Sequence, residues 1–251
     1  MTPSVVHAML NVDAGVPWPS RILDLSYGGG HIKLVPPKRK SPSELYDTYP
    51  IAVGQGRDLS EATANVPLVR RFLNALAWRE QTHIREVGLE VTSWATHQAI
   101  QVLVNPVVDN FDSSSLVEPH SEAARLALAF YREGLSLQHT AFQFLSFFKV
   151  FNILNSTGGP QIDWLNAHHA AVVGAKARKR VDALLANGGD VGGYLYKSGR
   201  CAVAHAFATP LVDPDSVDDE RRLASDLPVI RELAAHYMQS ELGLPAPRRA
   251  V

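Results

Sequence analysis

The aromatic stretch between residues 142 and 151 constrains the fold of this chain more than any other feature. It holds five of the nine phenylalanines, namely Phe142, Phe144, Phe147, Phe148 and Phe151. Phenylalanines at these spacings point to most sides of an α-helix, and a helix that is apolar on most sides is buried. The sequence therefore predicts a buried helix here, at the centre of a helical core in the second half of the chain.

Helical signals flank that stretch on both sides. Before it, Pro119 fits a first helical turn, and Ser121-Glu122 leads into a helix over 123–133. After it, we expect one long helix over 162–185, ended by the glycine pair that follows Asn187. From about residue 116 onward the chain therefore predicts an all-helical region.

Two further helices are expected near the C-terminus. The first begins with Ser198 as its N-cap, because a serine hydroxyl can accept from the free backbone N–H groups of a first turn, and it stops at Pro210. An acidic loop over 213–220 follows. Asp226 is the expected N-cap of a last amphipathic helix, whose inward face carries Ile230, Leu233, Ala234, Tyr237 and Met238.

The first hundred residues carry strand signals instead. We expect a helix over 68–78 from its apolar spacing, and a hairpin that turns at Gly28-Gly29-Gly30. The strands are expected over 5–12, 21–26, 31–35, 87–91 and 99–104. The predicted fold class is α+β, in which an N-terminal mixed β/α domain of unknown role over 1–115 precedes an all-α helical bundle over 116–251.

Composition excludes several classes of protein. The net charge is −1, so a globally basic nucleic-acid-binding protein is not indicated, although a local patch is enough for phosphate contacts. Cys201 is the single cysteine, which rules out an intrachain disulfide and fits a cytoplasmic protein. The N-terminus lacks the pattern of a secretion signal, and polar residues interrupt the longest apolar stretch, so no membrane contact is expected.

The segment 199–206, Gly-Arg-Cys-Ala-Val-Ala-His-Ala, has the clearest chemistry. Arg200 stands five residues before His205, with small apolar residues between them that let another helix approach closely. A permanent cation and an imidazole that titrates near neutral pH suit the recognition of a phosphate. On a regular α-helix the two side chains point about 140° apart. One groove therefore receives both only if Arg200 bends across or a second subunit contributes.

This second half resembles a HEPN domain, a helical-bundle family in which an R-x4-6-H motif opens a late helix. Arg200-x4-His205 matches that motif, and the aromatic pair of helices, from Tyr131-Arg132-Glu133 through the phenylalanine-rich stretch, matches the usual pattern. The resemblance covers residues 118–243. More loosely, the whole chain is similar to the J-type accessory proteins of bacterial methylamine-utilisation loci.

The HEPN resemblance implies a candidate metal-independent endoribonuclease or an RNA-binding module that works as a homodimer across a cleft. It makes His205 the catalytic acid and base, and Arg200 the cation that stabilises the phosphate. Cleavage through the 2′-hydroxyl needs proton transfer and charge stabilisation but no metal. Active members usually have a polar residue such as Asn after the arginine, whereas here it is Cys201, a poor hydrogen-bond donor. A non-catalytic accessory or dimerisation protein, in methylamine utilisation, is therefore the alternative.

Further substrate contacts are expected around the motif. Lys197 lies three residues before Arg200 and is a candidate phosphate contact. Tyr131 and Glu133 are candidates for lining the cleft, and Cys201 completes the predicted substrate-binding set; for Glu133 a role as an ordinary surface carboxylate is the alternative.

No metal or cofactor site is expected. His168 and His169 are adjacent, so they face about 100° apart on a helix and are poorly placed to share one ion. The sequence also has no His-Glu-x-x-His zinc motif.

Overall fold

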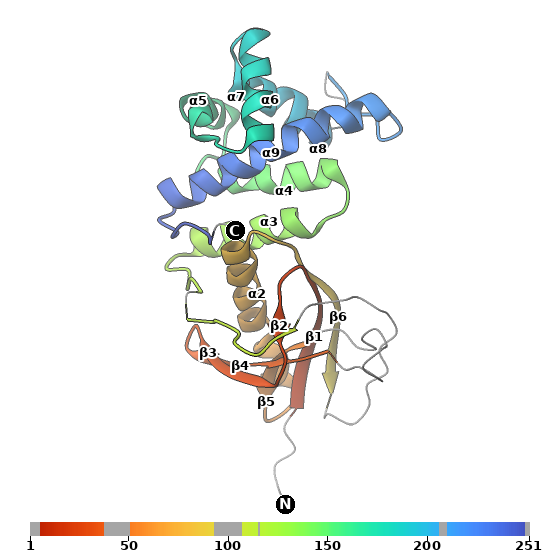
Figure 1. Ribbon diagram of the computed structural model, residues 1–251, viewed down its shortest axis with the longest axis vertical. Helices are drawn as coiled ribbons and strands as arrows, with labels where there is room; N and C mark the ends of the chain where they lie inside the picture. The colour runs from red at the N-terminus through yellow and green to blue at the C-terminus, as the bar shows by residue number, and fades with distance from the viewer. Residues whose placement is uncertain (1–5, 38–50, 93–106, 115, 206–209, 249–251) are drawn as a thin grey trace, which may run out of the picture. The chain divides into compact units, whose positions relative to one another are not determined.

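The computed structural model describes residues 6–37, 51–92, 107–114, 116–205 and 210–248. Contacts divide the chain into two units. Met1–Glu118 together with Pro247–Val251 form the first, here the sheet unit, and Pro119–Ala246 form the second, here the helical unit. Figure 1 shows the strands in the sheet unit, coloured red to yellow, and the long helices of the helical unit in green to blue. The division into domains with separate roles stays a prediction.

The sheet unit contains a five-stranded antiparallel sheet with the strand order β3-β4-β5-β1-β6. Its strands are β1 (Val6–Ala14), β3 (Leu23–Tyr27), β4 (Gly30–Val35), β5 (Ile51–Gly56) and β6 (Ile84–Thr92). A separate short parallel pair joins β2 (Trp18–Pro19) to β7 (Val107–Val108). Two helices, α1 (Leu59–Ala64) and α2 (Val66–Glu80), follow β5.

The glycine turn predicted between β3 and β4 is confirmed. Gly28 and Gly29 have φ values of 56° and 76°, the left-handed region in which glycine has no Cβ to clash. The two strands pair from Leu23 with Leu34 to Tyr27 with Gly30. The helix expected over 68–78 and the strand over 87–91 are confirmed within α2 and β6. The strand expected over 99–104 lies outside the described residues, and β5 and α1 were not predicted.

The core of the sheet unit lies between the sheet and α2. Leu10 on β1 and Phe72 on α2 are fully buried. Tyr27 packs edge-to-face against Phe72, with the ring centroids 5.6 Å apart. Its hydroxyl donates to the carbonyl oxygen of Val117 at 2.8 Å. Along β3, half-buried or buried residues alternate with exposed ones, which is the pattern of a strand with one covered face.

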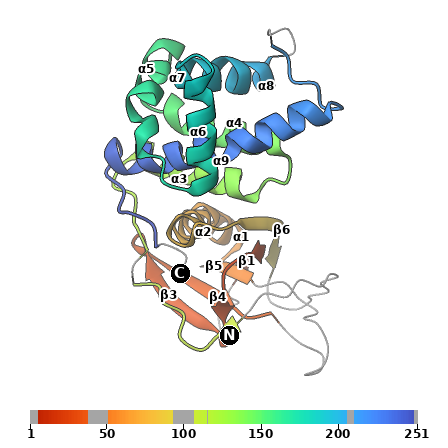
Figure 2. The same cartoon turned by 45° about the horizontal axis from the view of Figure 1, so that its top comes forward.

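The helical unit contains helices only among its described residues. They are α3 (Glu122–Ser136), α4 (Thr140–Asn152), α5 (Gly158–His168), η1 (His169–Ala171), α6 (Ala175–Ala186), α7 (Val191–Tyr194), η2 (Leu195–Cys201), α8 (Ala202–Ala204) and α9 (Val217–Ser240). Figure 2 gives a second view of these elements, in which α4 and α9 again lie side by side, in line with their many contacts. The chain is thus a mixed α+β protein with a helical C-terminal region.

Helix α4 is the predicted aromatic helix, with one correction. Phe144, Phe147, Phe148 and Phe151 are at most 1% exposed and form the centre of the helical core. Phe142 was expected to be buried with them but is 54% exposed. Its ring instead contacts the imidazole of His139, with centroids 5.0 Å apart.

Several predicted helix boundaries were wrong. The long helix over 162–185 is broken after Ala171, because the N–H groups of Val173 and Gly174 turn to donate to the Glu232 carboxylate at 2.9 Å. Pro119 precedes α3, whose N-cap is Ser121, as its hydroxyl oxygen accepts from the Ala124 N–H.

Two predicted N-caps lie inside helices instead. Ser198 sits within η2, because the helix that carries it already begins after Asp190, whose carboxylate caps it. Asp226 lies in the middle of α9, which begins at Val217 with Ser216 as its N-cap. Part of the expected acidic loop, from residue 217 onward, therefore belongs to α9. In the described part of the chain, no helix is long and apolar enough to cross a membrane.

Candidate functional site

A π-helical turn carries the predicted motif. Asp190 caps α7, which continues without a break into η2, a π-helix over Leu195–Cys201, and then into α8. A π-helix is closed by i→i+5 hydrogen bonds, so residues five apart lie about one turn apart on the same side. The π-helix ends at Cys201, however, and the chain returns to α-helical geometry in α8, where the His205 N–H donates to the Cys201 carbonyl oxygen at 3.0 Å. The helix ends at His205, whose backbone is extended with φ −133° and ψ 115°, so its side chain does not follow the spacing of a regular α-helix and reaches Arg200 within one subunit.

The structure places the two motif side chains in direct contact. Nη1 of Arg200 is 3.1 Å from Nε2 of His205. A guanidinium carries only donors, so Arg200 donates and Nε2 of the imidazole accepts. His205 therefore holds its ring proton on the other nitrogen in this arrangement. Both side chains are partly exposed, so the pair is open to solvent.

Cys201 and Tyr196 complete this cluster, which we call the Arg200 site. The Cys201 thiol lies 3.7 Å from Nη1 of Arg200, and the Arg200 guanidinium lies over the ring of Tyr196 at 5.6 Å. Burial raises the pKa of the Tyr196 phenol, with the Cys201 charge as a second cause, while Arg200 opposes the rise. The cluster presents one permanent cation, one imidazole, one thiol and one phenol.

Two glycines let the Arg200 site approach the helical core, as the small residues of the motif predicted. A Cβ on Gly199 would stand 2.3 Å from the Phe144 ring, and one on Gly158 would stand 2.5 Å from the Tyr196 ring. Both distances are far below van der Waals contact. The π turn therefore packs against α4 and the start of α5 at a separation that only glycine allows.

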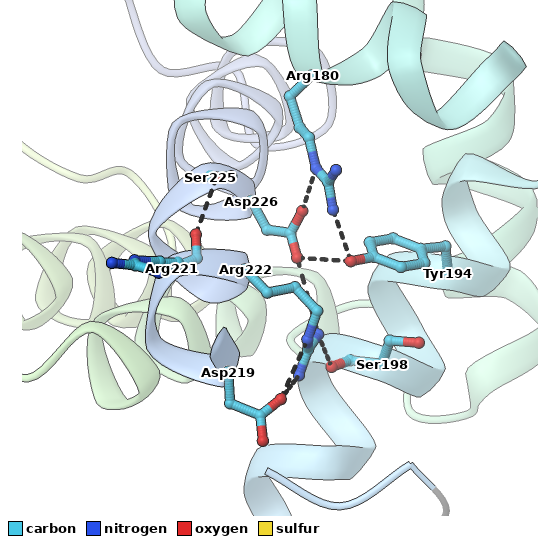
Figure 3. A network of polar contacts seen from close by, with 8 residues as sticks. All are labelled: Arg180, Tyr194, Ser198, Asp219, Arg221, Arg222, Ser225 and Asp226. Carbon is cyan, nitrogen blue, oxygen red and sulfur yellow. Dashed lines mark hydrogen bonds and ion pairs between the residues drawn. The ribbon is translucent and has the colours of Figure 1, made fainter. Parts of the chain in front are cut away.

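A buried polar network lies behind the π turn, between α6, α7 and α9 (Figure 3). The Asp226 carboxylate is fully buried. Its Oδ1 accepts from Nε of Arg180 at 2.7 Å, and its Oδ2 accepts from the Tyr194 hydroxyl at 3.0 Å. That hydroxyl in turn accepts from Nη2 of Arg180 at 2.7 Å. Burial raises the pKa of Asp226, against the opposing hydrogen bond from Arg180, and burial also raises the pKa of Tyr194.

Arg222 connects this network to the π turn itself. Its Nη1 donates to the carbonyl oxygen of Ser198 at 2.6 Å and lies 3.9 Å from Oδ2 of Asp226. Its Nη2 is 3.1 Å from the Asp219 carboxylate. Ser198 precedes Arg200 by two residues, so the network reaches the backbone that carries the motif.

The remaining predicted site residues are not gathered at the Arg200 site. Tyr131 is 1% exposed and packs edge-to-face on Phe147, with centroids 5.1 Å apart, so the prediction that it lines a cleft was wrong. It faces inward because the aromatic core of α3 and α4 takes up its ring. Glu133 is an exposed residue of α3. Lys197 is an exposed residue of the π turn and is near enough to the Asp190 carboxylate to help lower its pKa.

The described residues contain no group of three or more His, Cys, Asp or Glu side chains that could hold a metal ion. His168 stacks on Trp164 with ring centroids 4.2 Å apart, and its Nδ1 contacts the Trp164 carbonyl oxygen at 2.8 Å. His169 begins the separate turn η1, so the two neighbouring histidines do not share one ligand position.

Sequence reasoning missed Tyr196 and the buried network. Tyr196 lies four residues before Arg200, the spacing at which helical side chains meet. Asp226 interrupts the apolar face of α9, in step with Leu223 and Ile230, which are both buried. A carboxylate on an apolar helix face needs an internal cation, and that rule would have directed attention to the arginines.

Comparison with known proteins gives one match. Residues 127–239 match a family model described as "Methylamine utilization protein MauJ". The matched span lies within the helical unit and includes α4, the whole π turn and most of α9. It supports the looser of the two resemblances, the one to methylamine-utilisation accessory proteins. Neither the curated proteins nor the solved structures that were compared contain a match to this chain.

Proposed function

We propose that this chain is an accessory protein of methylamine utilisation, and that its helical unit acts by binding the phosphodiester backbone of RNA at the Arg200 site. The accessory role is supported by the family match over residues 127–239. The choice of an RNA phosphate as the ligand is supported by the 3.1 Å contact between Arg200 and His205, whose side chains are both partly exposed. HEPN-like architecture and a homodimer across the site belong to the same proposal.

The chemistry of the site favours an anion. In the free protein the imidazole accepts from one N–H group of Arg200, and other N–H groups of the guanidinium can donate to phosphate oxygens in a forked geometry. Protonation of His205 would replace the acceptor at Nε2 with a second donor. An anion held between the two side chains would then be stabilised by both. Lys197, three residues earlier and exposed, adds a cation on the same turn.

RNA binding by fluorescence anisotropy tests this proposal, with a labelled single-stranded RNA as the probe. Arg200→Met keeps an unbranched apolar side chain and removes the guanidinium and its charge, so affinity is expected to fall about tenfold or more, the effect of one charged hydrogen-bonding contact. Arg178→Met is the matched control, because Arg178 is an exposed arginine of α6 paired with Asp182. Equal affinity of wild type and Arg200→Met would refute RNA recognition at this site.

Metal-independent RNA cleavage is the second candidate. It is favoured by the presence of an imidazole beside the cation that would hold the scissile phosphate. His205 would take the proton of the 2′-hydroxyl as the 2′-oxygen forms its bond to phosphorus, and Arg200 would stabilise the charge of the developing phosphorane. The P–O5′ bond would then break, and the protonated imidazole would return the proton to the leaving 5′-oxygen. Cleavage that survives a chelator and is lost in His205→Gln supports a nuclease. Cleavage that persists in His205→Gln, or none in the wild type, leaves the site as a binding site.

The accessory role has its own test. Deletion of the gene is expected to impair growth on methylamine and to leave growth on another carbon and nitrogen source unchanged. Complementation with the wild type and with Arg200→Met then tells whether the Arg200 site serves that role. Normal growth of the deletion strain on methylamine would contradict the accessory function.

A further inference from the structure

The buried carboxylate of Asp226 joins three helices at one point. It receives Arg180 from α6 and the Tyr194 hydroxyl from the end of α7, and itself stands in the middle of α9. Two arginines, Arg180 and Arg222, face two carboxylates, Asp226 and Asp219, so the network is balanced in formal charge. A buried carboxylate without such partners would destabilise the fold.

The network holds the π turn at two places. Tyr194 is the residue immediately before η2, and its hydroxyl exchanges hydrogen bonds with Arg180 and Asp226. Arg222 donates to the carbonyl oxygen of Ser198, in the middle of η2. Figure 3 shows both attachments on the same side of the turn, facing α9. Both connections reach the chain before Arg200.

The turn has a competing conformation. π-helices are rare because the α-helix is the default arrangement of the same backbone, and a π turn needs stabilising contacts from outside. Relaxation of η2 to an α-helix would turn Arg200 and Cys201 about the helix axis relative to Tyr194 and Tyr196. The side chains that hold the π register therefore also hold the Arg200 guanidinium over the Tyr196 ring.

We propose that Tyr194, Arg222 and Asp226 are positioning residues, which fix the π turn in the register that places the Arg200 guanidinium over the Tyr196 ring. The inference rests on the proposed function for the ligand of the site. The positioning of the turn does not depend on that ligand. Alkylation of Cys201 tests the positioning of the turn, and RNA binding tests the ligand.

Cys201 is the probe for the turn, since it is the single cysteine of the chain, is partly exposed and belongs to η2. The alkylation rate of its thiol by iodoacetamide reports the surroundings of the turn in the native protein. In Arg222→Met and Tyr194→Phe we expect this rate to rise by about tenfold and threefold, respectively, because each change releases the turn and a charged hydrogen bond is stronger than a neutral one. Arg222→Lys, which keeps the charge and one donor, is expected to restore part of the wild-type rate.

Leu233→Ala is the matched control for lost stability. Leu233 is fully buried on α9 but belongs to no part of the network. Its truncation destabilises the helical unit without releasing the π turn, so the alkylation rate under native conditions is expected to stay within about twofold of the wild type. If Arg222→Met and Tyr194→Phe fold cooperatively and also stay within twofold, the positioning role is wrong. Equal acceleration in Leu233→Ala would likewise overturn it, because general loosening would then explain the change.

RNA binding is measured in the same variants. Weaker binding that parallels the change in alkylation rate supports both proposals. A changed alkylation rate in a protein whose wild type binds no RNA refutes RNA recognition and leaves the positioning of the turn supported. Unchanged RNA affinity in variants with altered alkylation shows that the register of the turn does not govern the ligand, and the inference fails in that part.

Discussion

Gly199 offers the sharpest test of the packing that places the π turn. In Gly199→Ala the new methyl group would stand 2.3 Å from Cζ and 2.5 Å from Cε1 of Phe144. Carbon atoms in contact are about 3.5–4.0 Å apart, so one of the two groups must move by about 1 Å or more. Phe144 is fully buried and stacks on Phe148 with centroids 6.2 Å apart, so its ring has little room to move.

Overpacking of this kind costs about 1–3 kcal/mol of the free energy of unfolding. Urea unfolding followed by far-UV circular dichroism measures it, and the helical unit contributes most of that signal. Gly159→Ala is the matched control, because no atom lies within 4 Å of a Cβ placed there. It is expected to leave stability unchanged or to raise it by about 0.5 kcal/mol, as alanine restricts the unfolded chain.

A double variant makes the cause explicit. Phe144→Leu removes the ring atoms that the new methyl group would meet, so its cost and that of Gly199→Ala should add up to more than the cost of the double variant. If Gly199→Ala is as stable as the wild type, or if the two changes are strictly additive, the close packing of the π turn on α4 is not what restricts this position to glycine.

Two further predictions concern the helical unit. Burial raises the pKa of Tyr237 from 10.0 to about 12, so the unfolded state loses the phenol proton at a lower pH than the folded state does. The free energy of unfolding should therefore fall as pH rises between these two values, which urea unfolding at several pH values measures. A Tyr237→Phe variant that shows the same decline would contradict this prediction. Ser121→Ala removes the hydroxyl that accepts from the Ala124 N–H at 3.1 Å and is expected to cost about 1 kcal/mol. Ser225→Ala, in an exposed part of α9, is its control, and an equal loss in both variants would show that capping is not the cause.

The helical half was predictable where periodicity is strong. The phenylalanines of α4 and the serine that caps α3 are local signals, because each depends on residues within a few positions of one another. The predictions of helices and strands failed where residues distant in the sequence determine the local structure. The break after Ala171 depends on Glu232, some sixty positions away, and β5 has too few distinguishing residues to be recognised without its neighbours in the sheet.

The candidate site was likewise predictable from the sequence only in part. The sequence by itself determined which groups are available, a guanidinium at position 200 and an imidazole at 205, and that glycine and alanine near them permit close packing. Only the tertiary structure decided that the turn is a π-helix, that Arg200 and His205 touch, and that Asp226 is buried rather than a cap. The physical reason is that helix register and the burial of a charge depend on partners such as Arg180 and Arg222, which local spacing does not reveal.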